Sequence, residues 1–142
     1  CKEVLDNKAG AVPSLIQAAA SNLGDILLAE AGSDEGKRRE AILVYSQAIA
    51  MGPPPKDQSS EDYEEALYQA AKYYLAQSAK AAKPESQAEY KGRAVNYLME
   101  LRGSFKGAPR SKDAEKELAA LGLGEKPKET PKEAPKETPK KP

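Results

Sequence analysis

Apolar residues recur at helical spacing in five segments of the chain, and glycine, proline and polar residues separate these segments. The first segment begins at Pro13 and Ser14 and ends near Gly32. Its aliphatic stripe, which we expect to face the core, consists of Val12, Leu15, Ile16, Ala19, Leu23, Ile26 and Leu27. The pattern therefore predicts a first helix with one strongly apolar side.

The second predicted helix covers residues 35–51 and stops at Gly52, which three prolines follow. Its inner stripe consists of Ala41, Tyr45, Ala48 and Ile49. A third helix is expected to start near Ser59, with Asp62 completing an approximate capping box. Its stripe is the clearest in the chain: Tyr63, Ala66, Leu67, Ala70, Ala71, Tyr74 and Ser78.

The fourth predicted helix covers residues 85–102, and the fifth covers residues 112–121, with Ser111 as its N-cap. The inward side chains of the fourth are Tyr90, Ala94, Tyr97, Leu98 and Leu101; those of the fifth are Ala114, Leu118 and Leu121. These five segments predict an all-α fold of antiparallel helix pairs.

The composition changes at the C-terminal end, where residues 125–142 repeat proline, lysine and glutamate. Such a segment lacks the apolar surface that would offset the entropy of ordering, so we expect a disordered, semi-stiff tail. The chain thus divides into a lead at residues 1–11, a helical domain at 12–123 and a tail at 124–142.

Two half-repeats in these helices resemble the tetratricopeptide repeat (TPR), whose units are helix pairs of 34 residues. The second predicted helix has the small, aromatic, small and proline positions of the TPR second helix: Ala41, Tyr45, Ala48 and Pro53. The third predicted helix has the residue spacing of the TPR first helix. The fourth predicted helix matches the TPR second helix after an insertion of about ten residues within residues 79–89. The matching residues are Leu67, Ala70, Ala71 and Tyr74 in the third helix, and Ala94, Leu98 and Leu101 in the fourth.

The resemblance implies a short superhelix with a concave groove that binds peptides. In that register Glu65, Tyr68, Lys72 and Leu75 point into the groove. Exposed tyrosine is a frequent interface anchor. Two alternatives stay open: the helices form an unrelated bundle, or the groove residues are merely half-covered by neighbouring helices.

The first residue, Cys1, is the only cysteine. Mature bacterial lipoproteins begin with the cysteine that carries their lipids, so one hypothesis is a lipid attached to Cys1. The other is a fragment boundary that falls on a cysteine. The segment Phe105 to Ala114 also resembles the turn between units in TPR proteins of the bacterial envelope, although its usual first proline is missing. Together these features suggest a periplasmic protein anchored to the membrane, with the outer membrane favoured because Lys2 replaces the aspartate of inner-membrane retention.

Candidate chemistry is sparse. The chain has no histidine, which removes the common nucleophile–base pairs and histidine zinc sites, so we expect no catalysis, metal or cofactor. Its 22 basic residues equal its 22 acidic ones, which argues against nucleic-acid binding. The basic cluster Lys37, Arg38 and Arg39 is expected to be a solvated helix face, with a contact to an acidic partner or a lipid head group as the alternative.

These observations predict a non-catalytic protein-binding scaffold, an adaptor or subunit of a multi-subunit envelope complex. A purely structural accessory subunit is the second hypothesis, and a helical bundle without a lipid anchor is a further variant. An enzyme or small-ligand carrier comes third.

Overall fold

The computed structural model describes residues 13–124, and these are organised as five α-helices. The helices are α2 (Pro13–Ala31), α3 (Glu35–Ala50), α4 (Glu61–Lys80), α5 (Pro84–Ser104) and α6 (Pro109–Ala120). The all-α prediction is confirmed. The expectations about Cys1, the lead at residues 1–11, Val12 and the tail at residues 125–142 fall outside the described residues.

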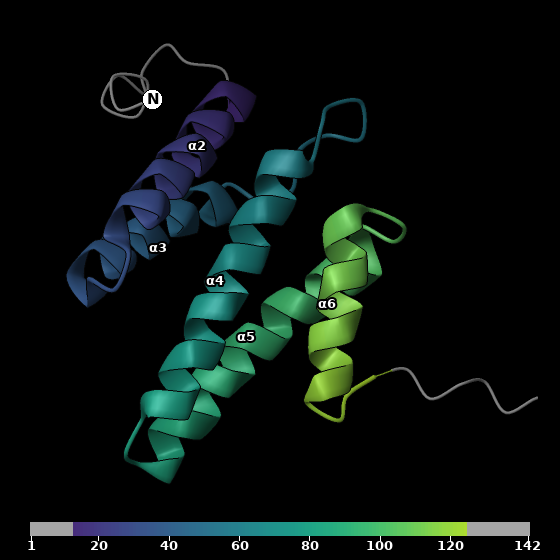
Figure 1. Cartoon of the computed structure of the whole chain (residues 1–142). Coiled ribbons are helices and arrows are strands. Elements are labelled where there is room, and N and C mark those ends of the chain that lie inside the picture. The colour runs from purple at the N-terminus through teal and green to yellow at the C-terminus, as the bar shows by residue number, and fades with distance from the viewer. Residues whose placement is uncertain (1–12, 125–142) are drawn as a thin grey trace, which may run out of the picture.

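The helices pack as antiparallel pairs in chain order. α3 packs along α2, and α5 packs along α4. α4 also contacts both helices of the first pair, while α6 contacts both helices of the second. In Figure 1, α2, α4 and α6 follow one another across the near side of the molecule, and α3 and α5 lie behind them. Every second helix therefore contributes to the same face.

Two buried clusters hold these helices together. The first joins α2, α3 and α4 and contains Ala20, Ala41, Ile42, Tyr45, Ala48 and Ala66. The second joins α4, α5 and α6 and contains Tyr63, Leu67, Ala71, Ala94, Leu98, Leu101, Ala114 and Leu118. Ile49 packs against both clusters, so the core continues from one pair to the next.

Most of the positions that carry the repeat pattern are fully buried. These are Ala41, Tyr45, Ala48, Leu67, Ala70, Ala71, Ala94 and Leu98. Tyr74 is half-buried, and Pro53 is exposed after the end of α3. Alanines at the contacts let the helix axes approach closely, which is why small residues dominate this core.

The predicted stripe of α2 is correct only in part: Ala19 is buried and Leu27 packs against the first cluster, but Leu15 and Ile26 are exposed. The buried residues of α2 are mainly small or polar: Gln17, Ala19, Ala20, Ser21, Gly24 and Ala31. The aliphatic side chains of Leu15 and Ile26 instead expose 53% and 50% of their surface. Tyr45 of α3 explains the difference, because a Cβ on Gly24 would lie 2.6 Å from the Tyr45 Cε1. Only the small face of α2 leaves room for this ring.

Polar residues on the small face of α2 satisfy backbone groups of its neighbours. The Gln17 Nε2 donates to the Ala48 carbonyl at 3.0 Å and to the Gly52 carbonyl at 2.9 Å. These carbonyls belong to the last turn of α3 and its exit, which lack helical donors. The Ser21 hydroxyl donates to the Asp62 carbonyl in the first turn of α4, at 3.0 Å. Burial of these polar groups is therefore compensated by hydrogen bonds.

Two predicted helix caps are wrong. α4 begins at Glu61, and the Ser60 hydroxyl donates to Glu64 Oε1 at 2.5 Å, so Ser59 and Asp62 form no capping box. α6 begins at Pro109, which needs no helical donor at its first position. Ser111 is consequently inside the first turn of α6, where it is buried.

The insertion expected within residues 79–89 is not a loop. α4 continues to Lys80, and α5 already starts at Pro84. The extra residues lengthen both helices beyond those of a standard repeat: α4 has 20 residues and α5 has 21. Pro84 opens α5 at a position where proline is tolerated.

A candidate binding face on α2, α4 and α6

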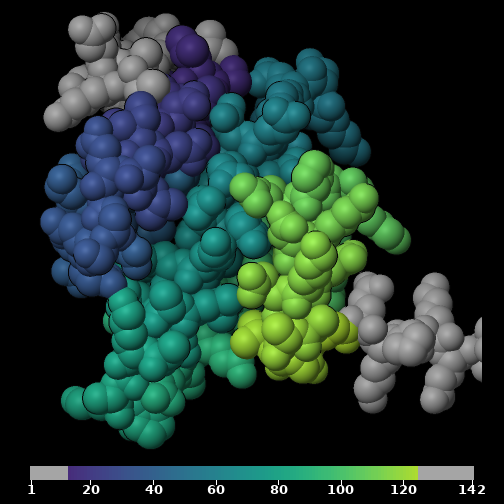
Figure 2. Space-filling view, viewed as in Figure 1, coloured from purple at the N-terminus to yellow at the C-terminus, as the bar shows by residue number. Residues whose placement is uncertain are grey.

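The face formed by α2, α4 and α6 is the surface on which three of the four predicted groove residues of α4 lie, namely Glu65, Tyr68 and Lys72. Figure 2 shows it with the atoms of α4 between those of the α2–α3 pair and those of α6. Gln69 and Ala76 lie about 180–200° around the α4 axis from the fully buried Leu67, since each residue advances the helix by about 100°. They therefore point away from the core of the second pair.

Arg110 of α6 binds the groove residues of α4. Its Nε donates to Glu65 Oε2 at 2.6 Å, and its Nη1 donates to Asp113 Oδ2 at 3.0 Å. The guanidinium also lies over the ring of Tyr68, 4.5 Å from the ring centre. One arginine thus joins α4 to α6 through an ion pair and a cation–π contact.

The predicted groove residues separate into two groups. Glu65, Tyr68 and Lys72 lie together, since Arg110 contacts the first two and the Lys72 Nζ lies 5.6 Å from the Tyr68 ring centre. Leu75 is half-buried and packs against the cluster formed by α4, α5 and α6. Tyr68 is also half-buried against that cluster, and burial is the main reason why its pKa is raised. Lys72 is the most open of the four.

A hollow of about 270 Å³ lies between the two helix pairs. Leu28 of α2, Arg38 and Ile42 of α3, and Gln69, Lys72 and Tyr73 of α4 line it. Leu28, Ile42 and Tyr73 belong to, or pack against, the first buried cluster. The hollow therefore combines an apolar wall with two cationic side chains. Sequence patterns did not reveal it, because it needs residues from three helices.

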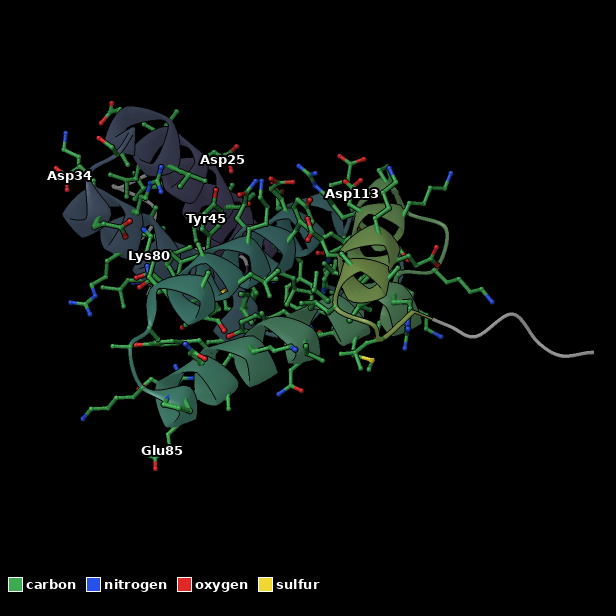
Figure 3. All side chains as sticks on the ribbon, turned by 60° about the horizontal axis from the view of Figure 1, so that its bottom comes forward. Asp25, Asp34, Tyr45, Lys80, Glu85 and Asp113 are labelled. Atoms are coloured by element: carbon green, nitrogen blue, oxygen red, sulfur yellow. The ribbon has the colours of Figure 1, made fainter. Side chains whose placement is uncertain are left out.

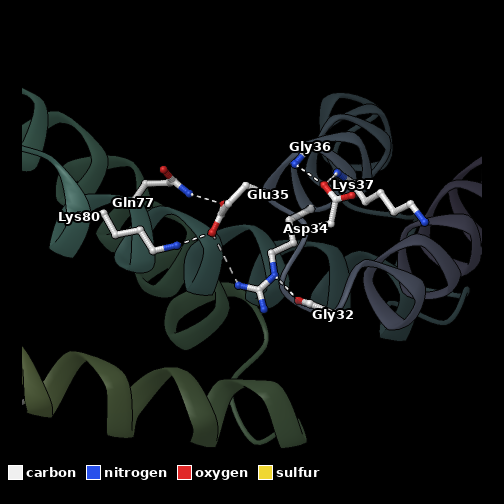
Figure 4. A network of polar contacts seen from close by, with 8 residues as sticks. Gly32, Asp34, Glu35, Gly36, Lys37, Gln77 and Lys80 are labelled. Carbon is white, nitrogen blue, oxygen red and sulfur yellow. Dashed lines mark hydrogen bonds and ion pairs between the residues drawn. The ribbon is translucent and has the colours of Figure 1, made fainter.

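Arg38 is held in place by its own neighbourhood, which Figure 4 shows. Its Nε donates to the Gly32 carbonyl at 2.8 Å, and its Nη1 lies 3.9 Å from Glu35 Oε1. Glu35 also binds Lys80 and accepts from Gln77 Nε2 at 3.3 Å. The hydrogen bond from Lys80 is the main cause of the lowered pKa of Glu35. The basic cluster thus contributes one fixed residue, while Lys37 and Arg39 are exposed.

Tyr45 and Asp25 form a half-buried hydrogen bond beside this face, and Figure 3 labels both residues. The Tyr45 hydroxyl donates to Asp25 Oδ1 at 2.5 Å. Burial, followed by the nearby Asp25 carboxylate, raises the pKa of Tyr45 strongly. Asp25 thus provides the hydrogen-bond acceptor for the hydroxyl of the buried Tyr45.

Four tyrosines of α4 and α5, Tyr73, Tyr74, Tyr90 and Tyr97, form a further aromatic cluster. Tyr74 lies 5.5 Å from Tyr73 and 6.1 Å from both Tyr90 and Tyr97, measured between ring centres. The Arg93 guanidinium lies 5.6 Å above the Tyr74 ring. These aromatic contacts hold the second helix pair together.

Residues 13–124 contain no group of three or more histidine, cysteine, aspartate or glutamate side chains arranged to hold a metal ion. None of the helices in this part of the chain combines the length and apolar character needed to cross a membrane. No protein-family model matches the chain, and neither does any curated protein or solved structure.

Proposed function

We propose that this chain is a non-catalytic protein-interaction module with TPR-like helix pairs, and that α2, α4 and α6 form its binding face. The arrangement of every second helix on one face carries this proposal. Stacked helix pairs of this kind typically use such a shared face to bind other proteins. The hollow between the pairs adds a place where a partner's side chain is received.

A permanently assembled structural subunit is the second candidate. Three large aliphatic residues support it, because Leu15, Ile26 and Leu43 expose 53%, 50% and 61% of their surface. Leu43 lies on α3, outside the binding face, so a single groove ligand would not cover all three. Exposed apolar side chains that stay covered in an assembly are typical of obligate subunits.

Photo-crosslinking in the producing cells tests the binding face directly. A photoreactive phenylalanine replaces Gln69 or Ala76 on α4, and the matched control replaces Gln47 on α3. Gln47 is exposed and lies about 200° around its helix from Tyr45, which faces α2. We expect a discrete adduct from the α4 positions and none from Gln47. Equal adducts at all three positions, or adducts from Gln47 alone, contradict the assignment of the face.

The purified chain distinguishes an adaptor from a structural subunit. An adaptor is expected to be a stable monomer by light scattering and thermal unfolding. A structural subunit is expected to aggregate or to melt at a much lower temperature without its partners, since its apolar surface is then uncovered.

We also propose that the protein acts at a bacterial membrane, with a lipid on Cys1 as its anchor and the outer membrane favoured. The resemblance of the segment Phe105 to Ala114 to the turn between units in TPR proteins of the bacterial envelope supports this localisation. We expect Cys1→Ser to move the protein from the membrane fraction to the soluble fraction in cells that express the full precursor. Unchanged membrane retention would exclude the lipid anchor.

A further inference from the structure

We infer that the hollow between α2, α3 and α4 receives a segment of a partner protein that carries a large aliphatic side chain and an acidic one. This inference rests on the proposed function and names the chemistry of its partner. It is carried by the lining of the hollow, its size and the distribution of charge at its rim.

The wall of the hollow suits an aliphatic side chain. Leu28 and Ile42 belong to, or pack against, the buried cluster around Tyr45, so they form the apolar side of the hollow. An aliphatic side chain placed there removes apolar surface from water, which favours binding. At about 270 Å³ the hollow lies below the usual range for drug-sized ligands, roughly 300–1,000 Å³. A side chain of a peptide is therefore a better fit than a cofactor.

The rim of the hollow suits a carboxylate. Lys72 has no carboxylate partner within 4.0 Å among the residues that the structure describes. Arg38 adds a second positive charge, which Glu35 offsets in part at 3.9 Å. The nearest acid on α4, Glu65, is already paired with Arg110 and accepts from Gln69 Nε2 at 2.6 Å. An incoming carboxylate gains an unpaired cation, whereas an incoming lysine would meet two like charges.

The test is a nuclear magnetic resonance titration of the ¹⁵N-labelled full chain with the peptide Ser-Gly-Leu-Glu-Leu-Gly-Ser. A second peptide with glutamine in place of glutamate is the matched control for charge. We expect the glutamate peptide to shift the amide signals of Leu28, Ile42 and Gln69. The glutamine peptide is expected to bind about two- to fivefold more weakly, the effect of one exposed ion pair, and raised salt should reduce that difference.

Two protein variants locate the effect. Lys72→Gln is expected to lower the affinity for the glutamate peptide by the same factor. Lys91→Gln, at an exposed position on α5, should leave that affinity unchanged. Lys72 is exposed, so its replacement leaves the core intact. No shifts around the hollow, equal affinity for the two peptides, or equal loss in both variants would overturn the inference. If the titration overturns the inference but Gln69 or Ala76 still crosslinks to a partner, the proposed acidic partner is wrong and the binding face on α2, α4 and α6 is retained.

Discussion

At the level of single residues, Gly24 decides how α2 meets α3. The Tyr45 ring occupies the space that a side chain at position 24 would need, and the Tyr45 hydroxyl donates to the adjacent Asp25. Helix periodicity alone favours the aliphatic stripe of α2 as the buried side. The large ring opposite requires a small residue at position 24, since a Cβ there would overlap it, and Leu15 and Ile26 remain exposed.

Gly24→Ala should destabilise the protein by about 1–3 kcal/mol, since the fully buried Tyr45 ring has nowhere to move. The matched control is Gly92→Ala on α5, where a new Cβ meets nothing within 4 Å. Alanine is the better helix former there and should stabilise by up to about 1 kcal/mol. Urea denaturation measures both values. A neutral Gly24→Ala would show that Tyr45 does not constrain α2.

Ser111 provides a second test at the level of single residues. The sequence predicts an N-cap there, whereas the structure places Ser111 inside the first turn of α6. An N-cap serine contributes about 0.5–2 kcal/mol, and its loss would destabilise by that amount. In the structure the Ser111 hydroxyl is buried and finds no hydrogen-bond partner among the described residues. Ser111→Ala should therefore be neutral or stabilising by up to about 1 kcal/mol in thermal unfolding. A loss of more than 1 kcal/mol would restore the capping role.

At the level of helices, the small faces of α3 and α4 determine how the pairs assemble. Alanine recurs on both, and the spacing of alanine with tyrosine or leucine was readable from the pattern alone. Those positions are buried as expected. Glu35 adds a polar connection, since its carboxylate joins the start of α3 to the last turn of α4. Exposed ion pairs contribute little stability, so packing dominates here.

Ala71→Leu tests that packing, because Ala71 is fully buried in the cluster shared by α4, α5 and α6. Added volume in a filled core should cost about 1–3 kcal/mol. Ala76→Leu on the same helix is the control, since Ala76 is exposed and the change should stay within about 0.5 kcal/mol. Equal effects of the two variants in guanidinium denaturation would contradict tight packing at position 71.

At the level of the whole molecule, stability should depend on pH through its buried tyrosines. Burial raises the pKa of both Tyr45 and Tyr63, and each hydroxyl donates to a carboxylate, that of Asp25 or Glu100. In the unfolded chain these phenols ionise near pH 10. Their contribution to stability is thus complete below about pH 10 and is lost as the pH rises further.

We therefore expect the urea midpoint to fall between pH 9.5 and about pH 11, the range above the ordinary tyrosine pKa. In a Tyr45→Phe, Tyr63→Phe variant the same rise in pH should lower the midpoint less, although its stability at neutral pH is reduced by two lost hydrogen bonds. Identical pH dependence of the two proteins would show that other groups govern alkaline unfolding.

The sequence by itself determined the number of described helices, most of their limits and the buried side of α3, α4 and α5. Helical periodicity, and glycine or proline at helix ends, are local properties that a chain carries without knowledge of its neighbours. Tertiary structure decided the orientation of α2, the partners of Arg110 and the hollow between the pairs. Each of these depends on side chains from two or three helices, and on whether a ring such as Tyr45 leaves room for what faces it.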